Sequence, residues 1–442
     1  MNRALLLSFA CCTLFLAGAA VVQAAGEANS AIYGPRLIVS PVQPDSLKIA
    51  IFPVQNLSGM PAPVQEISAE LTLVVERTGA RLVENSALEA FIERHWIRQL
   101  GYIDGQTAQL LKRETNADAV LLSNVEVHSD DGIPRFALIS RLVELDDLPR
   151  ILWMDSAALT GDQNPGLLNM GAITDVRALR SKVLERISSS LQKFIFEPPV
   201  RKQLPLASTF LGDQTFTIHD LATRMSSPRS IQEGPLSQDQ NKDLKRGARP
   251  DIAGKRGKTG LFEGLILPSY NPRRWYSSLH IPADLRYTVA IAPIIDHSTR
   301  KNAAELLELH LAKQLVNDGS LNVLELGVIR AKMLAARLIM NEGISAPAID
   351  AIALSLKTDL IVNGKVFDFT ETTGVTYTPM VDFTLQMFER DTRRILWSSQ
   401  SRNRGDDGVY FYDWGRIYTA STLADNMSSA LIRKFIGQAA GK

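Results

Sequence analysis

The feature that most constrains this chain is an internal repeat. The segment IAIFPVQNLS, which begins at Ile49, recurs as VAIAPIIDHS from Val289, an offset of 289 − 49 = 240 residues. Further matches follow in the same order: ADAVLL from Ala117 with TDLIVN from Thr358, Ile151-Leu152-Trp153 with Ile395-Leu396-Trp397, and QKFI from Gln192 with RKFI from Arg433. Because the order is kept and the offset is nearly constant, we expect two copies of one domain.

Each copy is predicted to hold a mixed β-sheet packed with helices, an α/β fold. The apolar run Ile49–Val54 is typical of a strand buried on both faces. After the matching run of the second copy, Ala304, Leu307, Leu311 and Leu315 lie three or four residues apart, which predicts a helix with Glu305, Glu308 and Lys313 on its other faces. Apolar and polar residues alternate over Val381–Met387, which indicates an antiparallel strand with one face towards the core.

The domain boundaries follow from the repeat and from changes in composition. The predicted ranges are 1–24 for a signal peptide, 25–47 for an N-terminal extension, 48–196 for domain 1, 197–286 for a linker and 287–437 for domain 2. Ser226–Gly260 holds eight Lys or Arg against four Asp or Glu and few large apolar residues, so a basic, partly disordered linker is expected.

The first residues predict export. Arg3 precedes an apolar run, and Val22-Gln23-Ala24 places small or short-branched residues where signal peptidase requires them, so cleavage is expected after Ala24. A retained membrane anchor is the alternative. Cys11 and Cys12 both lie inside the signal, so the mature protein would have no disulfide and no cysteine-bound metal. Neither cysteine follows a lipoprotein signal pattern.

Composition and motifs point away from nucleic acid and from catalysis. Lys and Arg number 48 against 47 Asp and Glu, which gives no strong field for a polyanion, so no nucleic-acid partner is predicted. Gly257-Lys258-Thr259 lacks the earlier glycine of a phosphate loop, since Ile252 stands there. The six histidines show no paired metal spacing. We therefore predict no catalytic residue, no cofactor and no metal site, and the chain is not expected to be an enzyme.

Two sets of residues are singled out with other roles. Turn or helix-cap positions after the first strand of each copy are predicted at Asn56, Ser58, Asp296 and Ser298. A candidate partner contact is predicted at Tyr410, Phe411, Tyr412 and Trp414, because aromatic residues are enriched at interface hot spots. The alternative for these aromatics is that they fill the core beneath the last helix.

These motifs resemble a known group of envelope proteins. The strand Ile49–Asn56 with its proline, the ADAVLL strand entry and the hairpin from Asp391 to Trp397 are similar to the periplasmic α/β domain shared by the TolB N-terminal domain, CsgG and LpoB. Arg393 stands where those families have glycine. The resemblance implies an envelope domain that binds partners or oligomerises.

The expected function is therefore a non-catalytic envelope protein–protein interaction or assembly factor, accessory to an assembly, export or secretion complex. The expected location is the periplasm, reached by the Sec pathway, with peripheral association with the outer membrane as an option. The expected partners are envelope or outer-membrane proteins, and a homo-oligomer is a further expectation. The alternative is a periplasmic small-ligand-binding protein that uses a cleft between the two domains.

Overall fold

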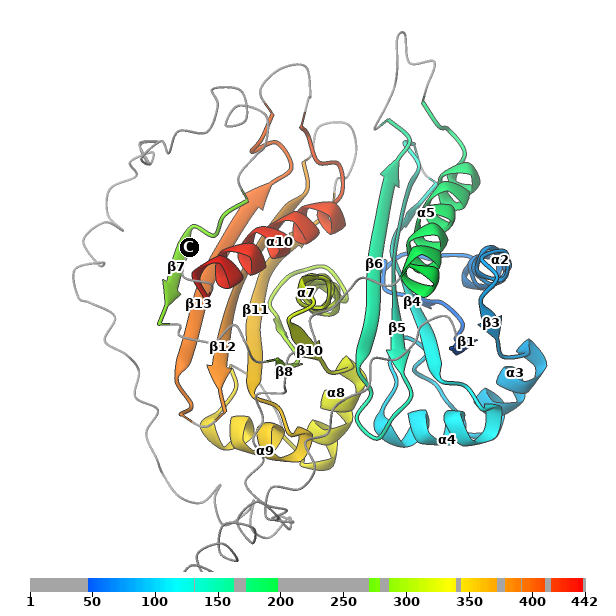
Figure 1. Ribbon diagram of the computed structural model, residues 1–442. Coiled ribbons are helices and arrows are strands. Elements are labelled where there is room, and N and C mark those ends of the chain that lie inside the picture. Colours follow the sequence, from blue (N-terminus) through cyan, green and yellow to red (C-terminus); the bar gives the residue numbers. More distant parts are fainter. Residues whose placement is uncertain are drawn as a thin grey trace, which may run out of the picture. The chain divides into compact units, whose positions relative to one another are not determined.

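A computed structural model describes residues 47–130, 132–162, 172–197, 270–278, 286–338, 343–371, 378–390, 392–409 and 415–439. All of these lie within one compact unit, Pro44–Lys442. The predicted signal peptide and most of the predicted linker lie outside the described residues. Among the described residues there are two mixed sheets and eight helices, so the predicted α/β fold class is confirmed (Figure 1).

The first repeat holds one sheet and four helices. Its strands are β1 (Lys48–Ile51), β2 (Gln55–Asn56), β3 (Arg81–Leu82), β4 (Ala119–Ser129), β5 (Arg135–Glu144) and β6 (Ile151–Thr160). Its helices are α2 (Val64–Glu76), α3 (Asn85–Arg94), α4 (Gly105–Thr115) and α5 (Val176–Phe196).

The second repeat has the same elements and one additional strand. Its strands are β7 (Arg274–Ser277), β8 (Tyr287–Ile291), β9 (Ile295–Asp296), β10 (Leu321–Val323), β11 (Leu360–Thr370), β12 (Met380–Glu389) and β13 (Ile395–Arg404). Its helices are α7 (Ala303–Asp318), α8 (Leu326–Ala335), α9 (Ala346–Leu356) and α10 (Ala420–Ala439).

The two sheets share one topology. The first has the order β3-β1-β4-β5-β6, and the second has β10-β8-β11-β12-β13-β7. In both, the short edge strand (β3 or β10) pairs in parallel with the short strand beside it (β1 or β8), which pairs in parallel with the first long strand (β4 or β11), and the long strands then pair antiparallel. β7 is the addition in the second sheet: it pairs with β13, and its Trp275 stacks on Trp397 with ring centroids 5.6 Å apart.

A bulge occupies the same place in both sheets. The pairing of β4 with β5 shifts between Val125 and Val127, and that of β11 with β12 shifts between Val366 and Asp368. A bulge leaves one extra residue on the longer side of the pair. The extra residues are Glu126 and Phe367, which stand 367 − 126 = 241 positions apart.

Helices of the second repeat complete the burial of the first sheet. α5 packs on β5 and β6, and α7 of the second repeat also packs on β6, as Figure 1 shows. Leu122 and Ile139 of the first sheet belong to one buried apolar cluster with Leu306 and Leu309 of α7. Since all four side chains are fully buried, α7 forms part of the core for both repeats.

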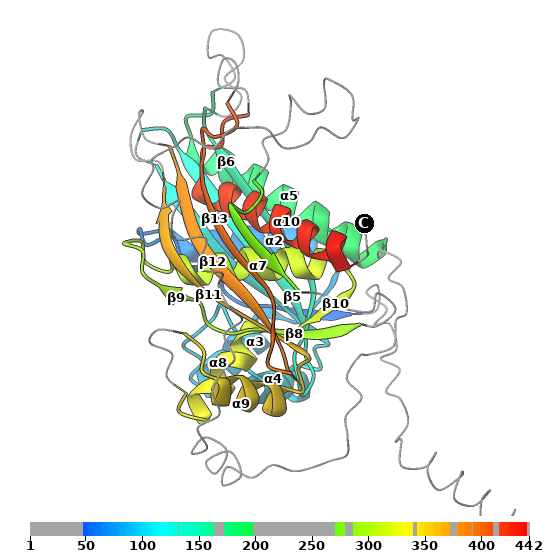
Figure 2. The same cartoon turned by 90° about the vertical axis from the view of Figure 1, so that its left-hand side faces the viewer.

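Turned by 90°, Figure 2 shows α10 and α7 lying across the strands of the second sheet. α10 packs against α7, and both contact β11, β12 or β13. None of the helices in the described ranges is long and apolar enough to cross a membrane.

Candidate functional site

The residues predicted to form turns lie at the ends of β2 and β9 (Asn56 and Asp296) and in the matching loops that follow (Ser58 and Ser298). Ser58 donates from its backbone nitrogen to Asn56 Oδ1 at 3.0 Å, and Ser298 donates to Asp296 Oδ1 at 2.8 Å. Both serine hydroxyls also donate to the same acceptor atom at 2.6 Å. The Asn56 and Asp296 side chains thus each close a turn, because Asn and Asp side chains often accept a hydrogen bond from the backbone two residues further on.

The helix ends themselves are occupied by other residues. Pro63 precedes α2 and Asn302 precedes α7, and neither makes a side-chain cap. Asp296 does reach the start of α7, because its Oδ2 accepts from the backbone nitrogen of Ala304 at 3.4 Å. His297 stacks on Phe367 with ring centroids 5.9 Å apart. The candidate contact residues Tyr410, Phe411, Tyr412 and Trp414 lie outside the described residues.

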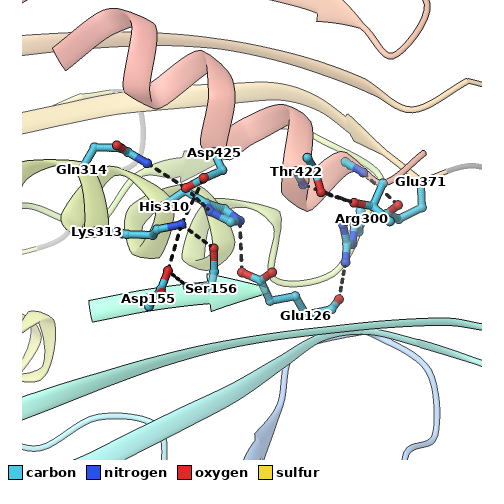
Figure 3. A network of polar contacts seen from close by, with 12 residues as sticks. Glu126, Asp155, Ser156, Arg300, His310, Lys313, Gln314, Glu371, Thr422 and Asp425 are labelled. Atoms are coloured by element: carbon cyan, nitrogen blue, oxygen red, sulfur yellow. Dashed lines mark hydrogen bonds and ion pairs between the residues drawn. The ribbon is translucent and has the colours of Figure 1, made fainter. Parts of the chain in front are cut away.

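Two clusters of buried charged groups lie between the two repeats. The first is the His310 cluster, which consists of Glu126, Asp155, Ser156, His310, Lys313 and Asp425. Its members come from β4 and β6 of the first repeat and from α7 and α10 of the second. Figure 3 shows these side chains converging between the helices and the first sheet.

His310 is the centre of this cluster. Its Nε2 lies 3.0 Å from Glu126 Oε1 and its Nδ1 lies 3.4 Å from Asp425 Oδ1, both ion-pair distances. One turn further along α7, Lys313 Nζ donates to Ser156 Oγ at 2.8 Å and to Asp425 Oδ2 at 3.0 Å. Every one of these contacts except those to Asp425 joins one repeat to the other.

The electrostatics of the cluster favour a charged imidazole. Burial alone would lower the pKa of His310, but the carboxylates of Glu126 and Asp425 outweigh it and raise that pKa to about 9. Burial would raise the pKa of Asp425, yet its contacts with His310 and Lys313 hold it well below its usual range. The cluster is therefore a set of compensated charges at neutral pH.

Arg300 extends the cluster along β4. Its Nη2 donates to the backbone oxygen of Glu126 at 2.7 Å, and its Nη1 donates to Glu371 Oε1 at 3.0 Å. Glu371 in turn accepts from the backbone nitrogen of Ala420 at 2.9 Å, at the start of α10. A carboxylate at a helix N-terminus is favourable because the helix dipole is positive there.

The second cluster, the Arg141 cluster, has Arg141 of β5 as its centre. Its guanidinium donates to Glu325 of the second repeat at 2.8 and 2.7 Å, to Asn124 at 3.1 Å and to the backbone oxygen of Gly101 at 2.5 Å. The side chains of Arg141 and Glu325 are 1% and 0% exposed. Burial lowers the pKa of Arg141, and the ion pair with Glu325 more than compensates.

A second arginine completes this cluster. Arg330 of α8 lies over the Tyr102 ring at 4.2 Å from its centroid, and Arg141 lies over the same ring at 5.1 Å. Arg330 also donates to Glu308 at 2.6 Å, and Glu308 accepts from the backbone nitrogen of Ile294 at 2.8 Å. Burial raises the pKa of Tyr102 and of Glu308, against the opposing effect of Arg330 on both.

Within each cluster, the charged side chains pair with one another. A buried ion pair is weak evidence for net stability, but its partners must stay together because an unpaired buried charge is costly. In the described part of the chain, no group of three or more His, Cys, Asp or Glu is placed to hold a metal ion. A cavity of about 440 Å³ lies elsewhere, beside Glu76, Leu82 and Asn85 of the first repeat.

Sequence reasoning missed both clusters. It placed Glu308 and Lys313 on faces of a helix away from the core, whereas their side chains are 1% and 6–8% exposed because the first repeat covers them. One sequence feature could have pointed to the clusters: α7 is rich in leucine, yet charged residues interrupt every one of its faces. Their partners Glu126 and Arg141 sit within long, otherwise buried strands.

Comparison with known proteins gives a partial likeness. No family model matches the chain, and no curated protein matches it. Among solved structures, the PelC dodecamer from Paraburkholderia phytofirmans is 18% identical, with 36% of this chain and 92% of that chain covered and a TM-score of 0.26. Lipoprotein GNA1162 from Neisseria meningitidis is 18% identical over 33% of this chain and 99% of that one, with a TM-score of 0.25.

The solution structure of LpoB from Escherichia coli is 12% identical, covering 45% of this chain and all of that one, with a TM-score of 0.20. Of the three proteins in the sequence resemblance, LpoB is thus among these structures, whereas a likeness to TolB or CsgG is not shown.

Proposed function

We propose that this chain is a non-catalytic protein of the cell envelope that binds other envelope proteins, as an accessory factor in an assembly, export or secretion complex. After removal of residues 1–24 it works in the periplasm, with peripheral association with the outer membrane. The proposal rests on the observation that the buried charged residues form contacts between the two repeats. Glu126, Arg141 and His310 hold one repeat against the other.

Exposed apolar side chains give such a protein its contact points. Trp96, after α3, and Leu334, in α8, are each 80% exposed. A large aromatic side chain with that exposure is a frequent anchor of protein interfaces. Tyr410 and its aromatic neighbours add a further candidate contact.

Photo-crosslinking in cells tests the proposal. A photoreactive amino acid at Trp96, Leu334 or Tyr410 of the full chain is expected to capture an envelope protein, identified by mass spectrometry. The same amino acid at Lys112, on the exposed side of α4, is the control and captures less. If none of the three positions yields more product than Lys112, the proposed function is wrong.

The alternative is a small-ligand-binding protein with its site between the repeats. Such a site needs open space there, and the described residues between the repeats are instead in direct contact, as the pair of Arg141 and Glu325 is. A saturable rise in melting temperature with an envelope metabolite would favour this alternative.

A further inference from the structure

The contact between the repeats is made by different surfaces on its two sides. The second repeat contributes its helix layer, through Arg300, Leu306, His310 and Lys313. The first repeat contributes the face of its sheet that its own helix α5 does not cover. A contact of this head-to-tail kind leaves one copy of each surface unused: a helix face on the first repeat and a sheet face on the second.

The unused helix face can be identified residue by residue. In the first repeat Ser68 accepts from the backbone nitrogen of Val54 at 2.9 Å, and in the second Glu308 accepts from Ile294 at 2.8 Å. Both pairs give an offset of 240, since 294 − 54 = 240 and 308 − 68 = 240. With that offset, the counterparts of Arg300, Leu306, His310 and Lys313 are Met60, Glu66, Glu70 and Leu73.

These counterparts are accessible. Met60 is 59% exposed and Leu73 is 52% exposed. The side chains of Glu66 and Glu70 are 55% and 37% exposed, and both contact Arg180 of α5. The helix face is thus an acidic pair flanked by two apolar side chains.

The unused sheet face is identified by the bulge. Phe367 holds the place in the second sheet that Glu126 holds in the first, and it is 44% exposed. Lys365 lies two residues before it, and Arg402 projects from β13 with a half-exposed side chain that pairs with Asp382 at 3.6 Å. This face therefore offers an aromatic ring beside Lys365 and the ion pair of Arg402 with Asp382, whereas the helix face offers methionine and leucine beside carboxylates.

We propose that a second copy of this chain docks the helix face of its first repeat onto the sheet face of the second repeat. The internal contact fixes the register: Arg300 reaches the backbone of Glu126, so its counterpart Met60 reaches Phe367 in the neighbouring copy. In the same register Glu70, the counterpart of His310, lies against Phe367, the counterpart of Glu126, and Lys365 lies two residues from that ring. Because the contact is head to tail, it leaves a free surface of each kind at the two ends of a dimer and continues into a ring or a filament.

This inference names one partner within the proposed function, and its test uses purified protein. The chain from residue 25 onward has no cysteine, so single replacements are the only thiols present. Met60→Cys protein and Phe367→Cys protein are mixed under mild oxidation. The mixed disulfide is expected to form faster than either homodimer, and the Met60→Cys/Phe367→Cys double variant is expected to form a ladder of linked species.

The matched control is the pair Trp96→Cys and Leu334→Cys, two positions more exposed than Met60 and Phe367 but outside both faces. Phe367→Asp is the second variant. It is expected to lower the molar mass seen by light scattering towards that of one chain, with an unchanged circular dichroism spectrum.

Disulfide formation between Met60→Cys and Phe367→Cys that is no faster than in the control pair would overturn the inference, as would an unchanged molar mass for Phe367→Asp. Either result would leave the proposed function standing if the photo-crosslinks in cells still capture another envelope protein.

Discussion

Helices α2 and α7 hold the same position in two copies of one fold, and their surroundings differ. α7 is buried on nearly every side, because the first repeat covers the face that its own sheet leaves open. α2 buries only Ile67, Leu71 and Val75, and its other side chains are partly or fully exposed. Leu306 and Leu309 of α7 stand where α2 has Glu66 and Ala69. A few positions thus decide whether one helix serves one core or two.

The sheets differ in the same way. By register, Ile139 of β5 corresponds to Thr384 of β12, because they lie opposite Asn124 and Lys365 in the two sheets. Ile139 is fully buried beneath α7, whereas Thr384 is partly exposed. The covered face is apolar with a few paired charges, and the open face is polar. The residues suited to the contact between the repeats thus occur on α7 and on the first sheet, and not on their counterparts α2 and the second sheet.

The largest effect is expected from breaking the Arg141 cluster. Arg141→Met leaves the buried carboxylate of Glu325 without its partner, so we expect the free energy of unfolding to fall by about 3–5 kcal/mol. Adding Glu325→Leu removes the unpaired charge and is expected to recover most of the loss. Denaturant titration of both variants measures this.

The control is Arg94→Met, at a surface arginine that pairs with Glu114 and is 64% exposed. There we expect a change below about 1 kcal/mol. A double variant as unstable as Arg141→Met alone would show that the cluster does more than compensate charge.

The next effect compares the two helices directly. Leu309→Ala removes a side chain that is fully buried between the repeats, and we expect a loss of about 2–5 kcal/mol. Leu73→Ala on α2 removes a leucine that is 52% exposed, and the expected change is within about 0.5 kcal/mol. Equal losses in denaturant titrations at low protein concentration would contradict the difference drawn between α7 and α2.

The sequence predicted the elements of this fold well and their environment poorly. The matches from Ile49 and Val289 predicted two copies of one sheet, and the alternation over Val381–Met387 predicted the antiparallel strand β12. These patterns are local, and each has the period of its own secondary structure.

The clusters between the repeats could not be predicted from the sequence, for a physical reason. Glu126 and His310 lie 184 positions apart, since 310 − 126 = 184, and neither carries a spacing that points to the other. A lone histidine in a helix is consistent with a solvated face, a core position or an ion pair. Only the packing of α7 on the first sheet decides among these.

The third effect is a dependence on pH. The folded-state pKa of His310 is about 9, above the value of about 6.5 expected in the unfolded chain. The stabilisation is therefore fully present below about pH 6.5 and is lost as the pH rises through about 9, with a total of about 3 kcal/mol. The groups that contact the imidazole are Glu126 from β4 and Asp425 from α10, and Lys313 of its own helix pairs with the same Asp425.

Unfolding curves of the natural chain and of His310→Gln between those pH values test this. The glutamine keeps a polar side chain but cannot be charged, so its stability is expected to change less over the same range. A parallel dependence in the two proteins would assign the titration to other groups.

The smallest effect probes the contact between the repeats without touching a charge. Gly327, in α8, lies so close to the first repeat that an added Cβ would stand 2.5 Å from the backbone oxygen of Ile103 and 2.9 Å from its carbonyl carbon and backbone nitrogen. Within a helix, Gly→Ala by itself is favourable by about 1 kcal/mol. Gly327→Ala is nevertheless expected to destabilise by about 1–3 kcal/mol, because backbone atoms cannot rotate away as a side chain would.

At Gly343 an added Cβ meets nothing within 4 Å, so Gly343→Ala is the control and should leave the unfolding midpoint unchanged. A Gly327→Ala protein more stable than the natural chain would mean that α8 moves away from Ile103 without cost, and that this close approach does not help to hold the repeats together.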